Sequence, residues 1–448
     1  MDTLPEGNVA DPVAQLEQTF VSVLRVLNIE GNEDSAGANE SSFEHQAHGI
    51  ELEDYAQELA FLPDLTEVSV TVLDYSAPNV LNKDLEKLQQ AGLIRVLKKH
   101  ERIMISSGNA LPPHAYGVVC DIDVKGHAPI KQRARRVPLR HLRKLYELLK
   151  GLLKAGLVAF SDSPWALPIV IVLKKNGLDI RLCIDYKLVN AITAIMEYAM
   201  PLVDDLLTDL EAYLWFYSLD AASGFWAIMM TLRARKISAF VCALGHFEWL
   251  RMPFGLKNAP MIYQRMIDNA LWGFVQPKGG WQHYATLMRA AEDRAQQLHD
   301  ASNELSLTEF GPESTSRTKF QADRAASMVT DPVTELVNSP IADMFSNGET
   351  DESALVPVFD RRSFGDDICF GGSTFDDCLA TLDRLLSRFE ECRISVSLRR
   401  ASSSSRGSTS CHMKYHAKGS ERTRRSLRPS PSSRSRHPRK ECSPSSAR

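Results

Sequence analysis

The sequence lacks any closely spaced pair of cysteines. Its eight cysteines are scattered and never form a C-x-x-C pattern, so neither a zinc ribbon nor a disulfide framework is visible. It also lacks a signal peptide at its start and any apolar run of about 18 residues, the length that a membrane span requires. We therefore expect a reduced intracellular protein, cytoplasmic or nuclear, that makes no use of a membrane.

Charge is nearly balanced over the whole chain but unevenly distributed along it. The net charge is −4, yet residues 399–448 hold fourteen Lys and Arg against Glu421 and Glu441, a local balance of +12. Residues 131–154 form a second basic segment, with nine Lys and Arg opposed only by Glu147. Such segments favour a polyanionic partner, although a solvated helix face is an equally good interpretation.

Composition divides the chain into five segments. Its 448 residues, 44% of them apolar, allow roughly two to four domains. Residues 1–110 are acidic and predicted to be partly disordered, with short amphipathic pieces at 12–28 and 82–99. Residues 111–275 alternate helical and strand patterns densely. Residues 276–358 form an acidic insertion of low order with one amphipathic helix, 359–398 a hairpin and a helix, and 399–448 a disordered Ser- and Arg-rich tail.

The two structured segments contain clear local signals. Leu and Tyr recur every three or four residues in 139–153, which predicts a helix whose outer face carries the basic residues. Residues 167–186 hold two apolar, β-branched runs around Asn176 and Gly177, a hairpin signal. "AYLWFYSLD", "WAIMMTL", "ISAFVCA" and "HFEWLRM" predict strands. Helices are predicted at 201–210, 258–272 and 375–389, the last with a capping box from Thr374 to Asp377.

Three acidic residues stand where neighbouring strands could bring them together. "SFGDDICFGG", residues 363–372, sets Asp366 and Asp367 at the tip of a tight hairpin, and Asp220 ends the strand "AYLWFYSLD". Adjacent carboxylates repel and raise each other's pKa, and a divalent cation removes that cost. Carboxylates on adjacent strands suit Mg²⁺, and two such ions could clamp the oxygens of a phosphoryl transfer. Taken alone, each motif is more often a turn or a solvated surface.

A series of motifs in a fixed order carries a family resemblance. The series contains "GHAPIKQRARRVPLRHL", "LVAFSDSPWALPIVIVLKKNG", "IRLCIDYKLVNAIT", "MPLVDDLL", "YSLDAASGFWAI", "GHFEWLRMPFGLKNAPMIYQRMID" and "SFGDDICF". Together they closely resemble the reverse transcriptase of gypsy-type long-terminal-repeat retrotransposons. The resemblance covers about residues 118–275 and 363–397.

The resemblance implies an α+β right-hand polymerase with fingers and palm, in which an antiparallel palm sheet packs on helices. Such an enzyme copies an RNA or DNA template into DNA from deoxynucleoside triphosphates and a primer. Asp220 and Asp366 would be the two metal ligands, and Asp367 the third carboxylate of the site. The implied cofactor is a pair of Mg²⁺ ions, with Mn²⁺ as the alternative.

Further site residues follow from the same resemblance. Lys174 and Arg181 match the cations that hold the triphosphate. Phe225 matches the aromatic residue under the sugar that excludes a 2′-hydroxyl, and Phe254 packs beside the incoming nucleotide. The templating base would be met by three consecutive residues, Asp185, Tyr186 and Lys187.

The chain also departs from the family pattern. Roughly eighty extra residues separate the helix at 258–272 from the acidic hairpin, and no primer grip or thumb is found after Leu398. Protease, ribonuclease H and integrase motifs are absent, so we expect those polyprotein products from separate segments. The tail after Leu398 is read either as frame-shifted sequence or as an RNA-binding tail. Two alternatives to an active polymerase stay open: an inactive retroelement remnant that only binds nucleic acid, and an acidic scaffold built on 276–358.

Overall fold

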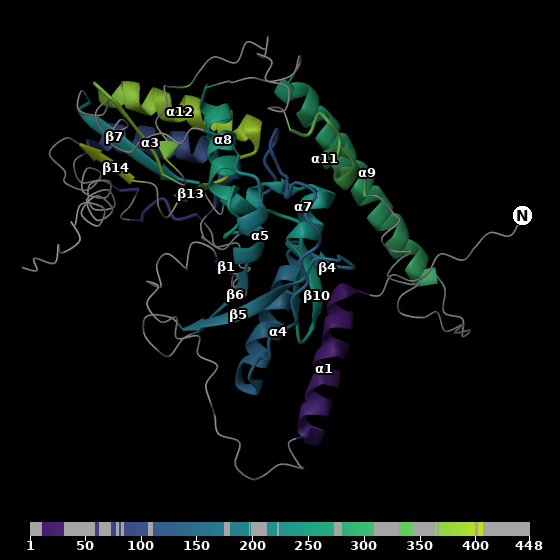
Figure 1. Ribbon diagram of the computed structural model, residues 1–448. Helices are drawn as coiled ribbons and strands as arrows, with labels where there is room; N and C mark the ends of the chain where they lie inside the picture. The colour runs from purple at the N-terminus through teal and green to yellow at the C-terminus, as the bar shows by residue number, and fades with distance from the viewer. Residues whose placement is uncertain are drawn as a thin grey trace, which may run out of the picture.

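The computed structural model describes the chain in several stretches, and all structural statements refer to them. They are residues 11–30, 59–61, 73–77, 80–81, 85–105, 111–173, 180–196, 198, 213–221, 224–272, 280–308, 331–343, 358, 363–364, 367–398 and 402–405. The protein is mixed α+β, with two larger sheets and a long helix along one side (Figure 1).

The first sheet has six strands and is built mostly from the middle of the chain. Its order is β1-β6-β5-β9-β10-β4, where only β5 and β9 run parallel. The strands are β1 (Leu59–Phe61), β4 (Val158–Phe160), β5 (Leu167–Leu173), β6 (Ile180–Asp185), β9 (Phe240–Cys242) and β10 (Gly245–Trp249). The predicted pairing of β5 with β6 is confirmed, while their connecting turn lies outside the described residues.

Helices flank this sheet. They are α4 (Leu139–Lys154), α5 (Lys187–Ile192) and α7 (Leu232–Ile237), and α1 (Pro12–Glu30) packs on α4. The ring of Phe20 in α1 stacks on Tyr146 in α4, with ring centroids 4.3 Å apart. The helix predicted at 139–153 is confirmed: one face is buried and the basic residues lie on the other.

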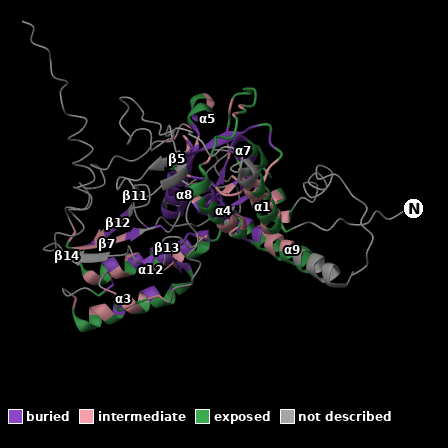
Figure 2. Ribbon diagram, turned by 90° about the horizontal axis from the view of Figure 1, so that it is seen from below, coloured by how far each residue is buried: buried purple, intermediate pink, exposed green. Residues whose placement is uncertain are grey.

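The second sheet has four strands and is antiparallel throughout, in the order β11-β12-β7-β14. The strands are β7 (Trp215–Asp220), β11 (Ser363–Phe364), β12 (Asp367–Gly372) and β14 (Ser402–Ser405). Helix α12 (Phe375–Cys392) covers this sheet and packs on α8 (Ala259–Trp272) and on α3 (Lys87–Lys99). Figure 2 shows α3 and α12 with exposed outer faces and buried residues between them.

Short elements connect the two sheets. They are η1 (Glu101–Ile103), β2 (Met104–Ile105), β3 (Val119–Cys120), η3 (Gly224–Ala227), β8 (Met229–Met230) and β13 (Val396–Ser397). Strand β3 runs parallel to β8, and β2 runs parallel to β13. One cluster of buried apolar side chains extends under both sheets, from Leu145 and Phe240 to Leu386 and Phe389.

Two helices lie in the segment between α8 and β11. Helix α9 (Gly280–Thr308) is the amphipathic helix predicted there, and α11 (Pro332–Val337) packs against it (Figure 1). The low order expected for 276–358 therefore does not hold for these residues. Helix α11 begins at Asp331, whose side chain accepts from the backbone N–H of Thr334, with Pro332 in the first turn. An N-cap Asp followed by Pro is a signal for the start of a helix, but the prediction of low order for 276–358 rested on composition alone.

Several other local expectations need correction. "WAIMMTL" was expected to be a strand, but residues 224–227 form the 3-10 turn η3 and only Met229 and Met230 are extended. Hydrogen bonds from Arg251 to Trp226 O and from Ala115 N to Ala227 O stabilise this turn. Strand β9 begins only at Phe240, because the preceding residues form α7. Residues 402–405 of the expected disordered tail form β14, since the edge of β7 offers them backbone partners.

The remaining expectations concern residues 201–210 and 31–48, the cysteines, and the membrane. The helix predicted at 201–210 and the linker at 31–48 lie outside the described residues. The cysteines in the described ranges are all free and buried, which agrees with the absence of a disulfide framework. In the part of the chain that the structure describes, each helix is too short or too polar to cross a lipid bilayer.

Candidate active site

The two strands that carry the predicted acids are direct neighbours. Strand β7 ends at Asp220, β12 begins at Asp367, and the register pairs these two residues across the antiparallel ladder. Directly opposed residues have Cα atoms about 4.5–5.5 Å apart and side chains on the same face of the sheet. The backbone therefore brings the two carboxylate positions together at one end of the sheet.

The acidic hairpin has the tight turn that the sequence predicts. Phe364 pairs with Asp367, so the connection consists of only Gly365 and Asp366. Those two residues, and the side chains of Asp220 and Asp367, lie outside what the structure describes. The register nevertheless makes Asp367, and not Asp366, the cross-strand partner of Asp220.

The residues present fit a hard divalent cation. Two carboxylate-bearing positions are opposed on neighbouring strands, and a third follows in the adjoining turn, which is an oxygen-rich donor set of the kind Mg²⁺ prefers. Among side chains that the structure describes, no group of three His, Cys, Asp or Glu residues could hold a metal ion. The metal site that the sequence predicts at Asp220, Asp366 and Asp367 involves side chains outside those that the structure describes.

Close backbone packing fixes the other end of these strands. A Cβ on Gly371 would lie 2.7 Å from the backbone oxygen of Trp215, and one on Gly372 would lie 2.7 Å from the backbone nitrogen of Cys378. Only glycine allows this approach of β12 to β7 and α12. The α12 N-cap Thr374 accepts from the N–H of Asp377 at 3.1 Å, which confirms that part of the predicted capping box.

The two aromatic residues expected at the nucleotide lie against each other. The ring centroids of Phe225 in η3 and Phe254 are 4.7 Å apart, and both residues are half-buried. The ring of Tyr263 in α8 lies 5.2 Å from Phe225 on the other side. A Cβ on Gly224 would approach the Tyr263 ring to 2.1 Å, so the glycine is required for η3 to pack on α8.

The predicted template residues separate into surface and core positions. Asp185, at the end of β6, accepts from the backbone N–H of Lys187 at 3.2 Å and lies 3.4 Å from Arg135. Lys187 is exposed at the start of α5. Tyr186 is fully buried, and its hydroxyl donates to the backbone oxygen of Ser238 at 3.0 Å. Burial raises the pKa of Tyr186 well above its usual value.

The predicted triphosphate residues are only partly within the described chain. Lys174 lies outside the described residues. Arg181 is in β6, where its backbone pairs with Val172 of β5, and nothing is described of its side chain. Nearby, the basic residues of segment 131–154 are mostly exposed, including Arg133, Arg140 and Lys144.

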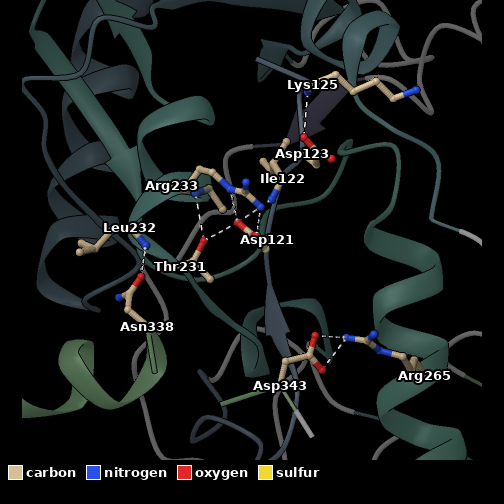
Figure 3. Close-up of polar contacts among 11 residues, drawn as sticks. Asp121, Ile122, Asp123, Lys125, Thr231, Leu232, Arg233, Arg265, Asn338 and Asp343 are labelled. Carbon is tan, nitrogen blue, oxygen red and sulfur yellow. Dashed lines mark hydrogen bonds and ion pairs between the residues drawn. The ribbon is translucent and has the colours of Figure 1, made fainter. Parts of the chain in front are cut away.

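A network of polar contacts centred on Asp121, the residue after β3, was not predicted from the sequence. The carboxylate of Asp121 accepts from the hydroxyl of Thr231 at 2.7 Å and from Arg233 Nε at 3.0 Å, while Arg233 Nη2 forms a second contact (Figure 3). Burial raises the pKa of Asp121, but the hydrogen bonds from Arg233 and Thr231 outweigh it and lower the pKa. This network fixes the start of α7 to the end of β3.

The α11 segment is attached to the same region. Arg265 of α8 donates to both oxygens of Asp343 at 3.0 and 2.9 Å, and the backbone N–H of Leu232 donates to Asn338 at 2.8 Å (Figure 3). The sequence contained a weak signal for one end of these contacts, since Thr231 precedes a charged helical pattern as an N-cap would. Their partners lie far away in the chain and could not be assigned.

Comparisons with known proteins match the middle of the chain to a known family. Residues 173–285 match the protein-family model described as reverse transcriptase (RNA-dependent DNA polymerase). This segment runs from the end of β5 through Asp220 and α8 into the start of α9. Residues 173–285 of this chain are therefore similar to reverse transcriptase domains.

Its relatives are polyproteins of retroelements. The chain is 34% identical over 163 residues to the enzymatic polyprotein of Soybean chlorotic mottle virus, covering 35% of this chain and 24% of that protein. It is 35% identical over 149 residues to the retrovirus-related Pol polyprotein from transposon 297 of Drosophila melanogaster, covering 32% and 14%. The chain thus spans less than a quarter of the length of these relatives.

A solved structure is also similar. The foamy viral protease-reverse transcriptase in complex with an RNA/DNA hybrid matches with a TM-score of 0.47 and 16% identity, covering 72% of this chain and 32% of that one.

Proposed function

We propose that the chain is an RNA-directed DNA polymerase of the gypsy type, which extends a primer with deoxynucleotides on an RNA or DNA template. The observation that carries the proposal is the cross-strand pairing of Asp367 with Asp220, which lies in the segment that matches the reverse transcriptase model. The gypsy assignment rests on the order of motifs in the sequence.

Each side chain of the site has a distinct task in this proposal. Asp220 and Asp366 hold the metal ions, and Asp367, the cross-strand partner of Asp220, supplies the third carboxylate. The chemistry that two bound Mg²⁺ ions supply is neutralisation of phosphate charge and alignment of the attacking and leaving oxygens. The paired acids of the hairpin then repel each other less, because cationic charge lies between them.

The aromatic pair shapes the nucleotide site. Phe225 and Phe254 are in contact and half-buried, so part of each ring faces outward from a rigid base formed by Tyr263. In the proposal, the outer edge of Phe225 leaves no room for a 2′-hydroxyl and so selects deoxynucleotides. Lys174 and Arg181 bind the triphosphate, and Arg suits this task because its fork meets two phosphate oxygens.

Template binding is assigned to the surface of the first sheet. Asp185 ends β6 and Lys187 begins α5, whereas the buried Tyr186 holds the segment in place through its hydroxyl. The exposed cations of segment 131–154 lie upstream and are proposed to contact template phosphates. Such contacts release counterions, so binding should weaken as salt concentration rises.

The test is a primer-extension assay on the full chain with Mg²⁺. The substitution Asp220→Asn should reduce incorporation by about 100-fold or more. The reason is that bound metal ions stabilise the charge of the transition state by several kcal/mol in such reactions. Asp376→Asn is the matched control, because this exposed acid lies in the first turn of α12 away from the strand ends. Incorporation that survives Asp220→Asn overturns the proposal.

The same preparation tests the alternative of an inactive remnant. That alternative is favoured by the exposed basic residues of 131–154, which need no catalytic site to bind a polyanion. Salt-sensitive binding of an RNA/DNA duplex without any incorporation by the wild-type chain would support it.

A further inference from the structure

A cluster of charged side chains joins the inserted helix α9 to the rest of the fold. Glu292 of α9 lies 2.9 Å from His114 Nε2 and 2.6 Å from Arg393 Nη1, both through its Oε1 atom. The guanidinium of Arg393 also lies over the ring of Tyr116, 5.4 Å from its centroid, and Tyr284 of α9 meets that ring edge-on. His114 is 8% exposed, whereas the side chains of Glu292 and Arg393 are 26% and 31% exposed.

His114, the first partner of Glu292, belongs to residues 114–116, whose backbone is hydrogen-bonded both to η3 and to α12. Next to His114, the N–H of Ala115 donates to Ala227 O, the last residue of η3, at 2.7 Å. The N–H of Tyr116 donates to Cys392 O, the last residue of α12, at 3.2 Å. Residues 114–116 therefore lie between the turn that presents Phe225 and the end of the helix that covers the acidic strands.

Arg393, the second partner of Glu292, lies at the turn after α12, from which the chain runs to the end of β7. Arg393 has a positive φ of 60° and ends α12, a conformation that costs a non-glycine residue energy. Three residues later Val396 forms a β-bridge with Ala221, the residue that follows Asp220. The ion pair with Glu292 thus fixes the turn from which the chain reaches the end of β7.

Glu292 also acts electrostatically on a second guanidinium group near the same turn, that of Arg251. Arg251 Nη1 donates to the backbone oxygen of Trp226 in η3 at 3.0 Å. Burial and the nearby charge of Arg393 lower the pKa of Arg251 to about 10, while Glu292 opposes this shift. Without Glu292, the like charges of Arg251 and Arg393 would lose a carboxylate that opposes their mutual repulsion. Such an uncompensated pair costs far more than the loss of one contact.

We propose that Glu292 is a positioning residue for the candidate catalytic centre, although it lies in the segment inserted between the two acidic strands. Through His114 and Arg393 it holds η3 and the Ala221 bridge, which directly follow Asp220 in the chain, at fixed positions. In this proposal helix α9, although inserted, contributes to polymerase activity by positioning these elements. This inference rests on the proposed function.

The test compares Glu292→Gln and Glu292→Leu with the control Asp293→Asn in the full chain. Asp293 is the adjacent exposed acid on α9, so its substitution changes the charge without touching the cluster. In primer extension, Glu292→Leu should lower kcat by about 10- to 100-fold with little change in KM for the primer-template, because small displacements of reacting groups have effects of this size. Glu292→Gln keeps a hydrogen-bonding carbonyl and should recover part of the loss.

Hydrogen exchange gives a second readout that does not depend on activity. The amide of Ala115 should exchange at least about tenfold faster in Glu292→Leu, while the amides of α4 keep their wild-type rates. A merely structural anchor would change global stability and all amides together, with kcat unchanged for the folded fraction.

The outcomes separate the two proposals. An active wild type whose kcat and Ala115 exchange are unaffected by Glu292→Leu overturns the positioning role alone. A wild type that never extends primers, yet shows faster Ala115 exchange in Glu292→Leu, overturns the polymerase proposal and leaves the structural link between Glu292 and the strand ends standing.

Discussion

The substitution Gly224→Ala tests the placement of the aromatic site without assuming any activity. The added Cβ would lie 2.1 Å from Cε2 and 2.7 Å from Cζ of the Tyr263 ring, where carbon atoms normally stay about 3.5–4.0 Å apart. Tyr263 is fully buried and is held against Phe225, so its ring cannot swing into solvent. Either η3 or the ring must therefore move by more than 1 Å.

The expected magnitude follows from two opposing effects. Overpacking of a well-packed site costs about 1–3 kcal/mol. Because Gly224 has no positive φ, alanine brings no backbone strain, and its smaller entropy in the unfolded chain returns about 0.4–1 kcal/mol. We expect a net destabilisation of about 1–2 kcal/mol, measured as a lower denaturation midpoint in urea with an unchanged m-value.

Two further variants make this prediction specific. Gly92→Ala in α3 is the matched control, because its Cβ would meet only the end of the Leu379 side chain at 3.3 Å, and alanine favours a helix. Tyr263→Leu removes the ring that Gly224→Ala would strike, so the double variant should be less destabilised than the two single effects together. If Gly224→Ala is as stable as wild type and shows no coupling to Tyr263→Leu, η3 does not pack on α8 and the aromatic site is misplaced.

Two other predictions concern the inserted segment. Burial raises the pKa of Glu292, but the hydrogen bonds and charges of His114 and Arg393 outweigh it and lower the pKa to about 2. Since this is below the unfolded value near 4.5, the stabilisation of about 3 kcal/mol is complete above that pH and is lost as pH falls toward 2. Burial likewise lowers the pKa of His114, with the same sense of pH dependence. Urea denaturation from pH 6 to pH 3 should show a smaller loss of stability in Glu292→Leu than in wild type, and equal losses would contradict the ion cluster. For the contact of Arg265 with Asp343, a double-mutant cycle with alanine at both positions should give a coupling of about 1–2 kcal/mol, and a coupling near zero would mean that α11 is not attached there.

Much of the local structure was predictable because its signals are local. The helices α4 and α12 follow from apolar residues spaced by three and four, α8 follows from the start signal at Asn258 and Pro260, and the start of α12 follows from Thr374. The pairing of β5 with β6 and the tight turn at the acidic hairpin follow from short apolar runs around turn residues. These elements needed no information from other parts of the chain.

The elements that were missed depend on distant partners. Turn η3 replaces a predicted strand because Ala115 and Arg251 bond to its backbone oxygens. Strand β14 is made of serines, which have no pattern of their own, and is extended because β7 presents a free edge to it. The buried position of Tyr186 depends on the oxygen of Ser238, which no local pattern indicates.

The amino-acid sequence alone determined that acids stand at the end of one strand and at the tip of one hairpin, within motifs that resemble a reverse transcriptase. Only the tertiary structure decided that Asp367 is the residue opposite Asp220, and that Glu292 pairs with His114 and Arg393. The physical reason is that residue type and spacing act over a few positions along the chain. Strand register and buried ion clusters, in contrast, are set by the packing of segments that meet only when the whole domain has folded.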